Sequence, residues 1–212
     1  MRLPDPMLSS PGPLPTGNGW TYEVKWNGFR AVVSTEDGLR VRSWRGWRMT
    51  SRLPELETLP PGLVLDGELV AWKNGVPHFP DVCRRLLWSD LSVPLTYVIF
   101  DLLRLDGEDI AARPYQERRD LLEALGLQGP TWVTPEAFDD GPSLWAAVCE
   151  YGLEGVIAKK LTSRYQPGQR GWVKVKNRKY WRRESELESM QQAAERRNRR
   201  RAKAAPKVAA AT

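Results

Sequence analysis

The 212-residue sequence predicts an α+β fold of mainly antiparallel sheets flanked by helices. Two observations lead to this prediction. Short runs of β-branched and aromatic residues recur between residues 20 and 176, and tight turns such as Asn-Gly or Asp-Gly separate many of them. A few stretches instead carry apolar residues at helical spacing. Strands joined by tight turns pair antiparallel, and the helices then pack on the sheets.

The predicted strands alternate in polarity or consist of β-branched and aromatic residues. In chain order they are YEVKW (22–26), AVVS (31–34), LRVRS (39–43), GLVLDGELVAW (62–72), VPHF (76–79), LTYVIFDLL (95–103), GVIAKK (155–160) and WVKVK (172–176). Helices are predicted over residues 81–87, 114–125 and 143–151. Asp140 precedes the last helix as a candidate N-cap, since its carboxylate can accept a hydrogen bond from a free helical N–H.

The two ends of the chain differ in composition from the strand-rich region. Residues 1–19 contain five prolines and three glycines, which predicts an extended arm laid over the surface or left mobile. Residues 178–207 have a net charge of +7, although the whole chain carries only +6. Residues 178–212 are therefore predicted to form a basic tail, partly helical and disordered towards its Ala-rich end. The domain between, residues 20–177, is close to neutral.

The basic tail allows two interpretations. It can serve only to keep the protein soluble. The density of charge favours the alternative, electrostatic binding to a phosphate backbone that is sensitive to salt and independent of base sequence. The arginines expected to make these contacts are Arg196, Arg197, Arg199, Arg200 and Arg201.

Composition excludes several kinds of protein and site. The two cysteines form no CxxC, so neither a disulfide scaffold nor a cysteine zinc site is expected. No apolar run approaches the roughly 20 residues that span a bilayer, so no membrane partner is expected. The phosphate-binding patterns GxxxxGK(S/T) and GxGxxG are absent. We expect a cytoplasmic protein whose partner is a nucleic acid or a nucleotide.

Charged side chains interrupt the predicted strands in a regular way. Alternate residues of a strand point to the same face, so Glu23 and Lys25 lie together. Three lysines and three carboxylates on sheets would suit a nucleoside triphosphate with Mg²⁺. These six residues are Glu23, Lys25, Glu68, Glu154, Lys174 and Lys176.

Five segments resemble, in order, the motifs of one enzyme superfamily. KWNGFR (25–30) resembles motif I, KxDGxR, of the covalent nucleotidyltransferases, which include ATP-dependent DNA ligases, RNA ligases and capping enzymes. The later motifs are matched by LDGELV (65–70), YVIFDLLRLDG (97–107), EGVIAKK (154–160) and WVKVK (172–176). The local sequence of these motifs is most similar to that of the bacterial ATP-dependent DNA ligases of end joining. The resemblance implies an ATP-grasp-like nucleotidyltransferase domain, that is, an adenylation domain, over residues 20–177.

The resemblance implies a three-step ligase reaction. Lys25 would attack the α-phosphate of ATP and become a lysyl-AMP. Lys174 and Lys176 would favour the neutral, attacking amine and offset charge on the phosphates. Glu154, together with Glu68, would position Mg²⁺ or Mn²⁺. AMP would then pass to the 5′-phosphate of a DNA nick and leave when the 3′-hydroxyl attacks, in DNA repair and recombination.

The resemblance also implies how the nucleotide is held. Arg30 would hold the ribose with Glu68. Phe100 would stack on the adenine, although a core role is also compatible with its place on a strand. Val156 would lie on the opposite face of the adenine, and Glu23 would read the amino edge of the base mainly through its backbone. The nucleotide-binding residues are thus Glu23, Val24, Arg30, Glu68, Phe100 and Val156.

Three departures from the family pattern leave a second interpretation open. Asn27 replaces the motif I aspartate, and Trp44 in SWRG (43–46) replaces an arginine that contacts phosphate. Arg45 would take its place only from a loop, because neighbouring strand residues point to opposite faces. Nothing after Lys176 resembles the oligonucleotide-binding barrel of most DNA ligases.

The first interpretation is a minimal DNA ligase that acts on nicked or broken duplex DNA, with the tail or a DNA end-joining or repair protein holding the duplex. The alternative is a catalytically weakened accessory protein that binds nucleotide or DNA. A third and more remote interpretation is an RNA ligase or a capping enzyme.

A few other residues have simpler interpretations. Asp66 and Asp106 precede glycines and are predicted in turns. His78 is predicted to be structural or exposed. Trp44 and Trp47 lie among arginines, where they would stack either on these side chains or on bases.

Overall fold

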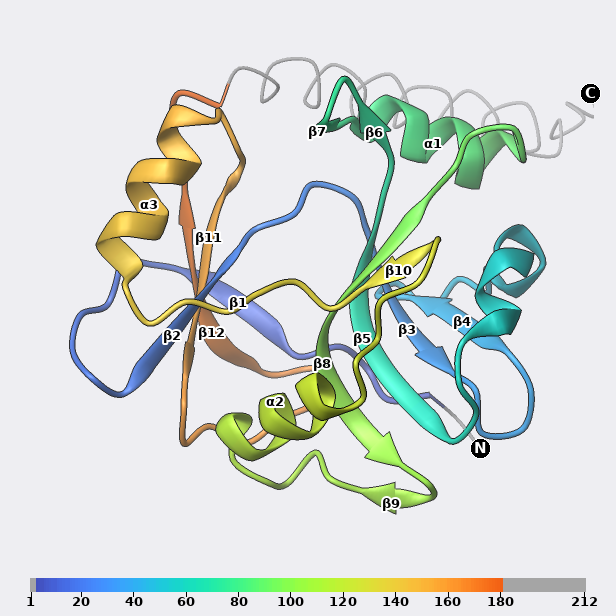
Figure 1. Cartoon of the computed structure of the whole chain (residues 1–212), viewed down its shortest axis with the longest axis horizontal. Coiled ribbons are helices and arrows are strands. Elements are labelled where there is room, and N and C mark those ends of the chain that lie inside the picture. Colours follow the sequence, from blue (N-terminus) through green and yellow to red (C-terminus); the bar gives the residue numbers. More distant parts are fainter. Residues whose placement is uncertain (1–2, 181–212) are drawn as a thin grey trace, which may run out of the picture. The chain divides into compact units, whose positions relative to one another are not determined.

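The computed structural model describes residues 3–180, and residues Met1–Arg178 form one compact unit. The arginines predicted to bind DNA lie outside the described residues. The α+β prediction is confirmed, because helices pack on two larger sheets whose strands are mostly antiparallel (Figure 1). No helix in the described part of the chain has the length and apolar character needed to cross a membrane.

The first sheet has four strands and is covered on one face by a helix. Its order is β1 (Leu8–Pro11), β12 (Arg170–Lys176), β11 (Gly155–Lys160) and β2 (Trp20–Val24), with β1 parallel to β12 and the other pairs antiparallel. Helix α3 (Gly141–Glu150) packs on it through Leu144 and Val148, which contact Tyr22 of β2. As predicted, Asp140 caps α3, and its carboxylate accepts a hydrogen bond of 3.0 Å from the N–H of Ser143.

The second sheet contains the long central strands. Its order is β10 (Trp132–Val133), β8 (Thr96–Leu105), β5 (Leu63–Val70), β3 (Phe29–Ser34) and β4 (Arg40–Ser43), with β9 (Glu108–Asp109) beside β8. The largest apolar cluster lies on one of its faces, under α1 (Phe79–Trp88) and the 3-10 helices η1 (Thr50–Arg52) and η2 (Pro54–Thr58). Helix α2 (Tyr115–Ala124) contributes Leu122 to the same cluster.

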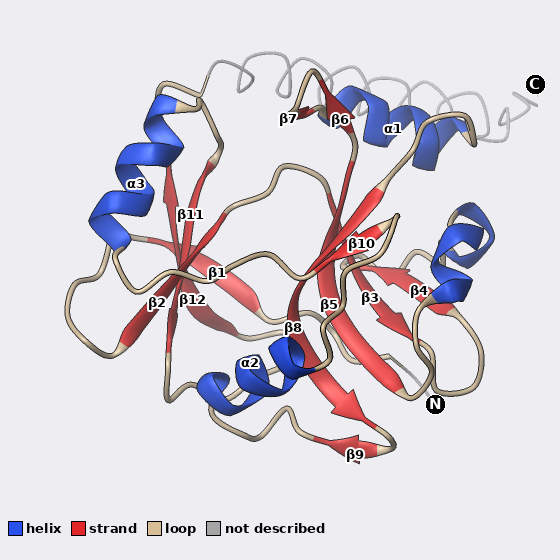
Figure 2. Cartoon of the chain, viewed as in Figure 1, coloured by secondary structure: helices blue, strands red, loops and turns tan. Residues whose placement is uncertain are grey.

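The two sheets are joined by a second apolar cluster. Val32, Val64 and Leu103 point into it from the second sheet, and Trp172 points into it from the first. Neighbouring residues in β3 point to the other face, as strand geometry requires. The strands of the two sheets form separate groups in Figure 2. Burial on both faces explains why the central strands are almost continuously apolar.

The structure differs from the prediction at three segments. Residues 8–11 of the predicted arm form β1, an edge strand of the first sheet. The strand predicted over 62–72 ends at Val70, and Trp72–Lys73 pairs instead with Val76–Pro77 as the β6–β7 hairpin. His78 precedes α1, and its Nδ1 lies 2.7 Å from an Oδ2 atom of Asp81.

The turn predicted at Asp66 is wrong. Asp66 lies inside β5 and has no exposed surface, because an ion pair compensates its burial. By contrast, Asp106 occupies a turn with φ = 48°, followed by Gly107 with φ = 85°, as predicted. The Asp-Gly pair is therefore a turn in one case and part of a strand in the other.

Candidate active site

Three strand ends of the first sheet bring the predicted nucleophile together with its partners. Lys25 follows β2, and its N–H donates to the carbonyl of Gly155 at 2.9 Å, beside the start of β11. The Lys25 Nζ lies 2.7 Å from Glu154 Oε1, and the Lys176 Nζ lies 3.2 Å from the same oxygen. One largely buried carboxylate thus holds two cations that come from separate strands.

The second sheet contributes Glu68 and Arg30, which are cross-strand partners in β5 and β3. Burial raises the pKa of Glu68 to about 8, and the positive charges of Lys25 and Arg30 partly offset this effect. Glu154 acts on Glu68 with the opposite sign. The two carboxylates and Lys25 are therefore close enough to interact electrostatically.

Lys174 belongs to the same electrostatic group. Its pKa is lowered by partial burial first, and then by the charges of Lys176 and Lys25. Three lysines with two carboxylates between them form a site that favours a polyanion. The structure thus places together five residues that the sequence predicts for phosphate, metal and catalysis: Lys25, Glu68, Glu154, Lys174 and Lys176.

Gly28, in the loop after the nucleophile, allows the backbone to pass close to β5. A Cβ atom at this position would overlap the carbonyl oxygen of Leu69 and would lie 3.0 Å from the Glu68 side chain. Only glycine fits at this position of KWNGFR without a shift of the backbone, because the loop carrying Lys25 lies against the strand carrying Glu68.

Gly28→Ala is expected to lower the free energy of unfolding by about 1–3 kcal/mol, because the loop or β5 must shift to admit the methyl group. Chemical denaturation measures this change. Gly19→Ala is the matched control, since a Cβ at Gly19 would meet no atom within 4 Å. Equal stabilities of the two variants would contradict the close approach.

Glu68→Gln is expected to flatten the pH dependence of stability between about pH 5 and pH 8. In this range folded Glu68 keeps a proton that the unfolded chain has released, so the free energy of unfolding of the parent protein falls as the pH rises. Denaturation of both proteins across this range tests the difference. Glu117→Gln, at an exposed position of α2, serves as control. Parallel pH profiles would show that Glu68 has an ordinary pKa.

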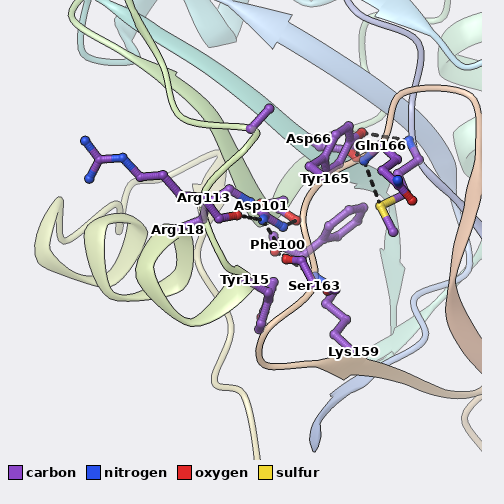
Figure 3. Close-up of polar contacts among 12 residues, drawn as sticks. Asp66, Phe100, Asp101, Arg113, Tyr115, Arg118, Lys159, Ser163, Tyr165 and Gln166 are labelled. Carbon is purple, nitrogen blue, oxygen red and sulfur yellow. Dashed lines mark hydrogen bonds and ion pairs between the residues drawn. The ribbon is translucent and has the colours of Figure 1, made fainter. Parts of the chain in front are cut away.

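Arg30 is held by the buried Asp66. Its Nε and Nη2 atoms donate to the two carboxylate oxygens at 3.0 and 2.6 Å. The Tyr165 hydroxyl donates to the same carboxylate at 2.5 Å, and Figure 3 shows these two side chains against each other. The guanidinium also lies 5.2 Å from the ring centre of Phe100 and 4.9 Å from that of Trp172. Asp66 and Tyr165 were not predicted as site residues.

Of the two neighbours in β11, Ile157 rather than Val156 packs against the same apolar cluster as Phe100. Val156 has no exposed surface and packs on the other face of β11, with Tyr22 and Val148. Ile157 and Phe100 are both partly buried against the cluster between the sheets. The structure therefore places Val156 on the face of β11 away from Phe100, and strand alternation is the physical reason.

A buried ion pair lies beneath Phe100. Lys159 is 1% exposed, and its Nζ lies 2.8 Å from both Glu23 Oε1 and the Phe100 carbonyl oxygen. The Tyr115 hydroxyl donates to the same Glu23 oxygen. Glu23 is buried, and its Oε1 atom thus binds two partners within the protein. Alternation in EGVIAKK would have identified Lys159 as an inward-pointing residue.

The two substituted motif positions are Asn27 and Trp44. Asn27 is buried in the loop after Lys25. Trp44 is half exposed in the turn after β4, and its N–H donates to the Arg30 carbonyl at 3.3 Å. Arg45 lies in the same turn with its guanidinium 5.0 Å from the Trp44 ring centre, so the arginine is carried by a loop, as the sequence requires.

The described residues contain no group of three His, Cys, Asp or Glu side chains arranged for a metal ion. Glu154 and Glu68 nevertheless offer two carboxylates to one site. Mg²⁺ is usually bound by one or two carboxylates, with phosphates and waters completing its shell. The donor set therefore fits a magnesium ion that arrives with a nucleotide.

A lysine between two sheets, surrounded by further lysines and carboxylates, defines a covalent nucleotidyltransferase domain. The family model described as ATP dependent DNA ligase domain matches residues 14–176. The chain belongs to this family.

Known proteins agree with this assignment. The chain is 36% identical over 182 residues to the multifunctional non-homologous end joining protein LigD of Mycolicibacterium smegmatis, which covers 81% of this chain and 23% of LigD. It is 37% identical over 193 residues to DNA ligase C2 of the same organism, covering 82% of this chain and 54% of that protein. A structure of mycobacterial DNA ligase D complexed with ATP and MES has 36% identity and a TM-score of 0.73, covering 82% of this chain and 60% of that one. The chain thus spans about a quarter of LigD and about half of DNA ligase C2.

Proposed function

We propose that the protein is an ATP-dependent DNA ligase that forms a lysyl-AMP at Lys25 and seals nicks in duplex DNA. The observation that carries the proposal is the group of charged atoms around Glu154, where Lys25 and Lys176 contact one carboxylate oxygen. A lysine in this setting is held in a fixed position beside cations that can receive a triphosphate.

In the first step the Lys25 amine attacks the α-phosphorus of ATP. A P–N bond forms, the P–O bond to the β-phosphate breaks, and pyrophosphate leaves. Lys174 and Lys176 lie where they can offset the negative charge that moves onto the departing group. The short contact with Glu154 keeps the amine oriented and offers an acceptor for the proton that the amine must lose.

The nucleotide is proposed to lie between the two sheets. Arg30, fixed by Asp66, would contact the ribose together with Glu68. The adenine would lie between Phe100 and Ile157, and the backbone of Glu23 and Val24 would face its amino edge. Strand alternation supports Ile157 in place of Val156.

Mg²⁺ is the proposed metal, and Mn²⁺ is expected to replace it. It would supply charge stabilisation to the phosphates. Glu154 and Glu68 would hold it from the protein side. The raised pKa of Glu68 makes this side chain the one that must release a proton as the cations bind.

In the later steps AMP would pass to the 5′-phosphate at a nick and be displaced by the 3′-hydroxyl. LigD is a non-homologous end joining protein, and DNA ligase C2 is named for DNA ligation. We propose the same substrate class here, in DNA repair and recombination at the bacterial nucleoid. Arg196–Arg201 are proposed to grip the backbone, alone or with a repair protein.

The weakened accessory protein is the second candidate, and Asn27 and Trp44 are the observations that favour it. Incubation with α-³²P-ATP and Mg²⁺ or Mn²⁺, followed by denaturing electrophoresis, separates the candidates. A ligase gives a covalently labelled protein that seals a nicked duplex when unlabelled DNA is added. An accessory protein binds ATP or DNA without label, and this result would overturn the proposal.

A further inference from the structure

Residues 3–13 precede the part of the chain that matches the family model. Met7 in this segment is connected to the proposed ribose site by hydrogen bonds through Tyr165. The N–H of Met7 donates to the Tyr165 hydroxyl oxygen at 2.8 Å, and this hydroxyl donates to Asp66 Oδ2 at 2.5 Å. Asp66 in turn binds Arg30 through two hydrogen bonds. These four groups form a continuous chain of donors and acceptors, called here the arm relay.

The arm relay is anchored rigidly at its N-terminal end. Met7 is 1% exposed and packs between the two sheets. Its neighbours are fixed on both sides, since the Leu8 N–H donates to the Gln169 carbonyl at 2.7 Å and the Gly168 N–H donates to the Pro6 carbonyl at 3.2 Å. The donor that meets Tyr165 therefore directly precedes β1 and is held by the hydrogen bonds of its neighbours.

The middle of the relay depends on Tyr165 because Asp66 has no exposed surface. A buried carboxylate keeps its charge only if its oxygens are paired. The hydroxyl of Tyr165 donates a second hydrogen bond to Oδ2, the oxygen that also accepts from Arg30 Nη2, and its acceptance of the Met7 N–H strengthens the bond that it donates. Burial and the Asp66 charge raise the pKa of Tyr165 well above its usual value, so the hydroxyl remains a donor.

We propose that Tyr165 and the backbone of Met7 are positioning groups that hold Arg30 in the orientation required to contact the ribose of ATP. The inference rests on the proposed function, in which Arg30 touches the nucleotide. Neither Tyr165 nor Met7 touches it. Their effect is to limit the rotation of the Asp66 carboxylate and hence of the guanidinium bound to it.

Tyr165→Phe removes the hydroxyl and keeps the ring in its place against Trp172. The test measures kcat/KM of lysyl-AMP formation with ATP and with its 2′-deoxy and 3′-deoxy analogues. The parent protein is expected to prefer ATP through the ribose contacts. In Tyr165→Phe this preference is expected to fall about tenfold, the effect of one hydrogen bond to a charged group. Met7→Pro, which removes the donor in the full chain, is expected to shift the preference in the same direction.

Val64→Ala and Tyr151→Phe are the controls. Val64→Ala loosens the same apolar cluster without altering a polar group, and Tyr151 is exposed. Both are expected to keep the preference of the parent protein. An unchanged preference in Tyr165→Phe, or an equal loss in Val64→Ala, would overturn the relay. If Tyr165→Phe does not fold, the preference of Met7→Pro for ATP over the deoxy analogues tests the relay instead, and an unchanged preference would overturn it. Absence of label in the parent protein would instead refute the proposed function.

Discussion

Replacing Lys25 with alanine is expected to eliminate the covalent label from α-³²P-ATP. The amine is the atom that forms the bond, so the loss is complete within detection rather than a reduced rate. Lys25→Arg is expected to give the same result, because a guanidinium keeps the positive charge beside Glu154 but does not lose its proton at neutral pH. Electrophoresis after denaturation measures the label, and Lys73→Ala, at an exposed position, is the control.

The same variant separates the steps of the proposed reaction. A nick that already carries AMP on its 5′-phosphate needs no lysyl-AMP, so Lys25→Ala is expected to retain sealing of this DNA. If Lys25→Ala lost both the label and the sealing of this adenylated DNA, Lys25 would be needed for the later steps as well as for lysyl-AMP formation. Retention of label in Lys25→Ala would place the nucleophile elsewhere.

The spacing of chemically distinctive residues allowed much of the site to be predicted from the sequence. Lys25, Glu154 and Lys176 lie at strand ends, where antiparallel pairing of β2, β11 and β12 makes distant parts of the chain adjacent. No tight turn joins β2 to β11, because β2 ends at Val24 and β11 begins at Gly155, so the order of the family motifs rather than a local turn indicated that they lie together. The family motifs also gave each of these residues an expected role.

Prediction failed where a side chain's direction or a long-range partner decides its role. Val156 and Ile157 are neighbours of similar chemistry, and only the pleat of β11 distinguishes the face each occupies. Asp66 has the local signature of a turn. Its burial depends on two residues of other segments, because Arg30 pairs with its charge and the Tyr165 hydroxyl donates a hydrogen bond to it. No local pattern contains that information.

The N-terminal arm illustrates the same limit. Its prolines and glycines are typical of an irregular segment, and no alternation marks residues 8–11 as a strand. The edge of β12 supplies the partner that makes them one. The prediction of an extended conformation was sound, whereas attachment to the sheet depended on a strand more than 150 residues away.

Glu154→Gln is expected to slow lysyl-AMP formation by about 10²–10³-fold at saturating ATP. Glutamine keeps the size of the side chain but removes the charge that holds Lys25 and Lys176 at 2.7 and 3.2 Å. The two cations then repel each other without compensation, the amine loses its fixed direction and its proton acceptor, and the metal loses a charged ligand. Single-turnover labelling measures the rate.

Two further measurements locate the origin of this effect. Glu150→Gln, at an exposed position of α3, is expected to leave the rate unchanged. Raising the concentration of Mg²⁺ or Mn²⁺ is expected to restore part of the rate of Glu154→Gln if the lost contact is to the metal, and none of it if the lost contact is to Lys25 alone. A rate equal to that of the parent protein would contradict the assignment of Glu154, because the shared carboxylate is the feature on which the arrangement of the lysines depends.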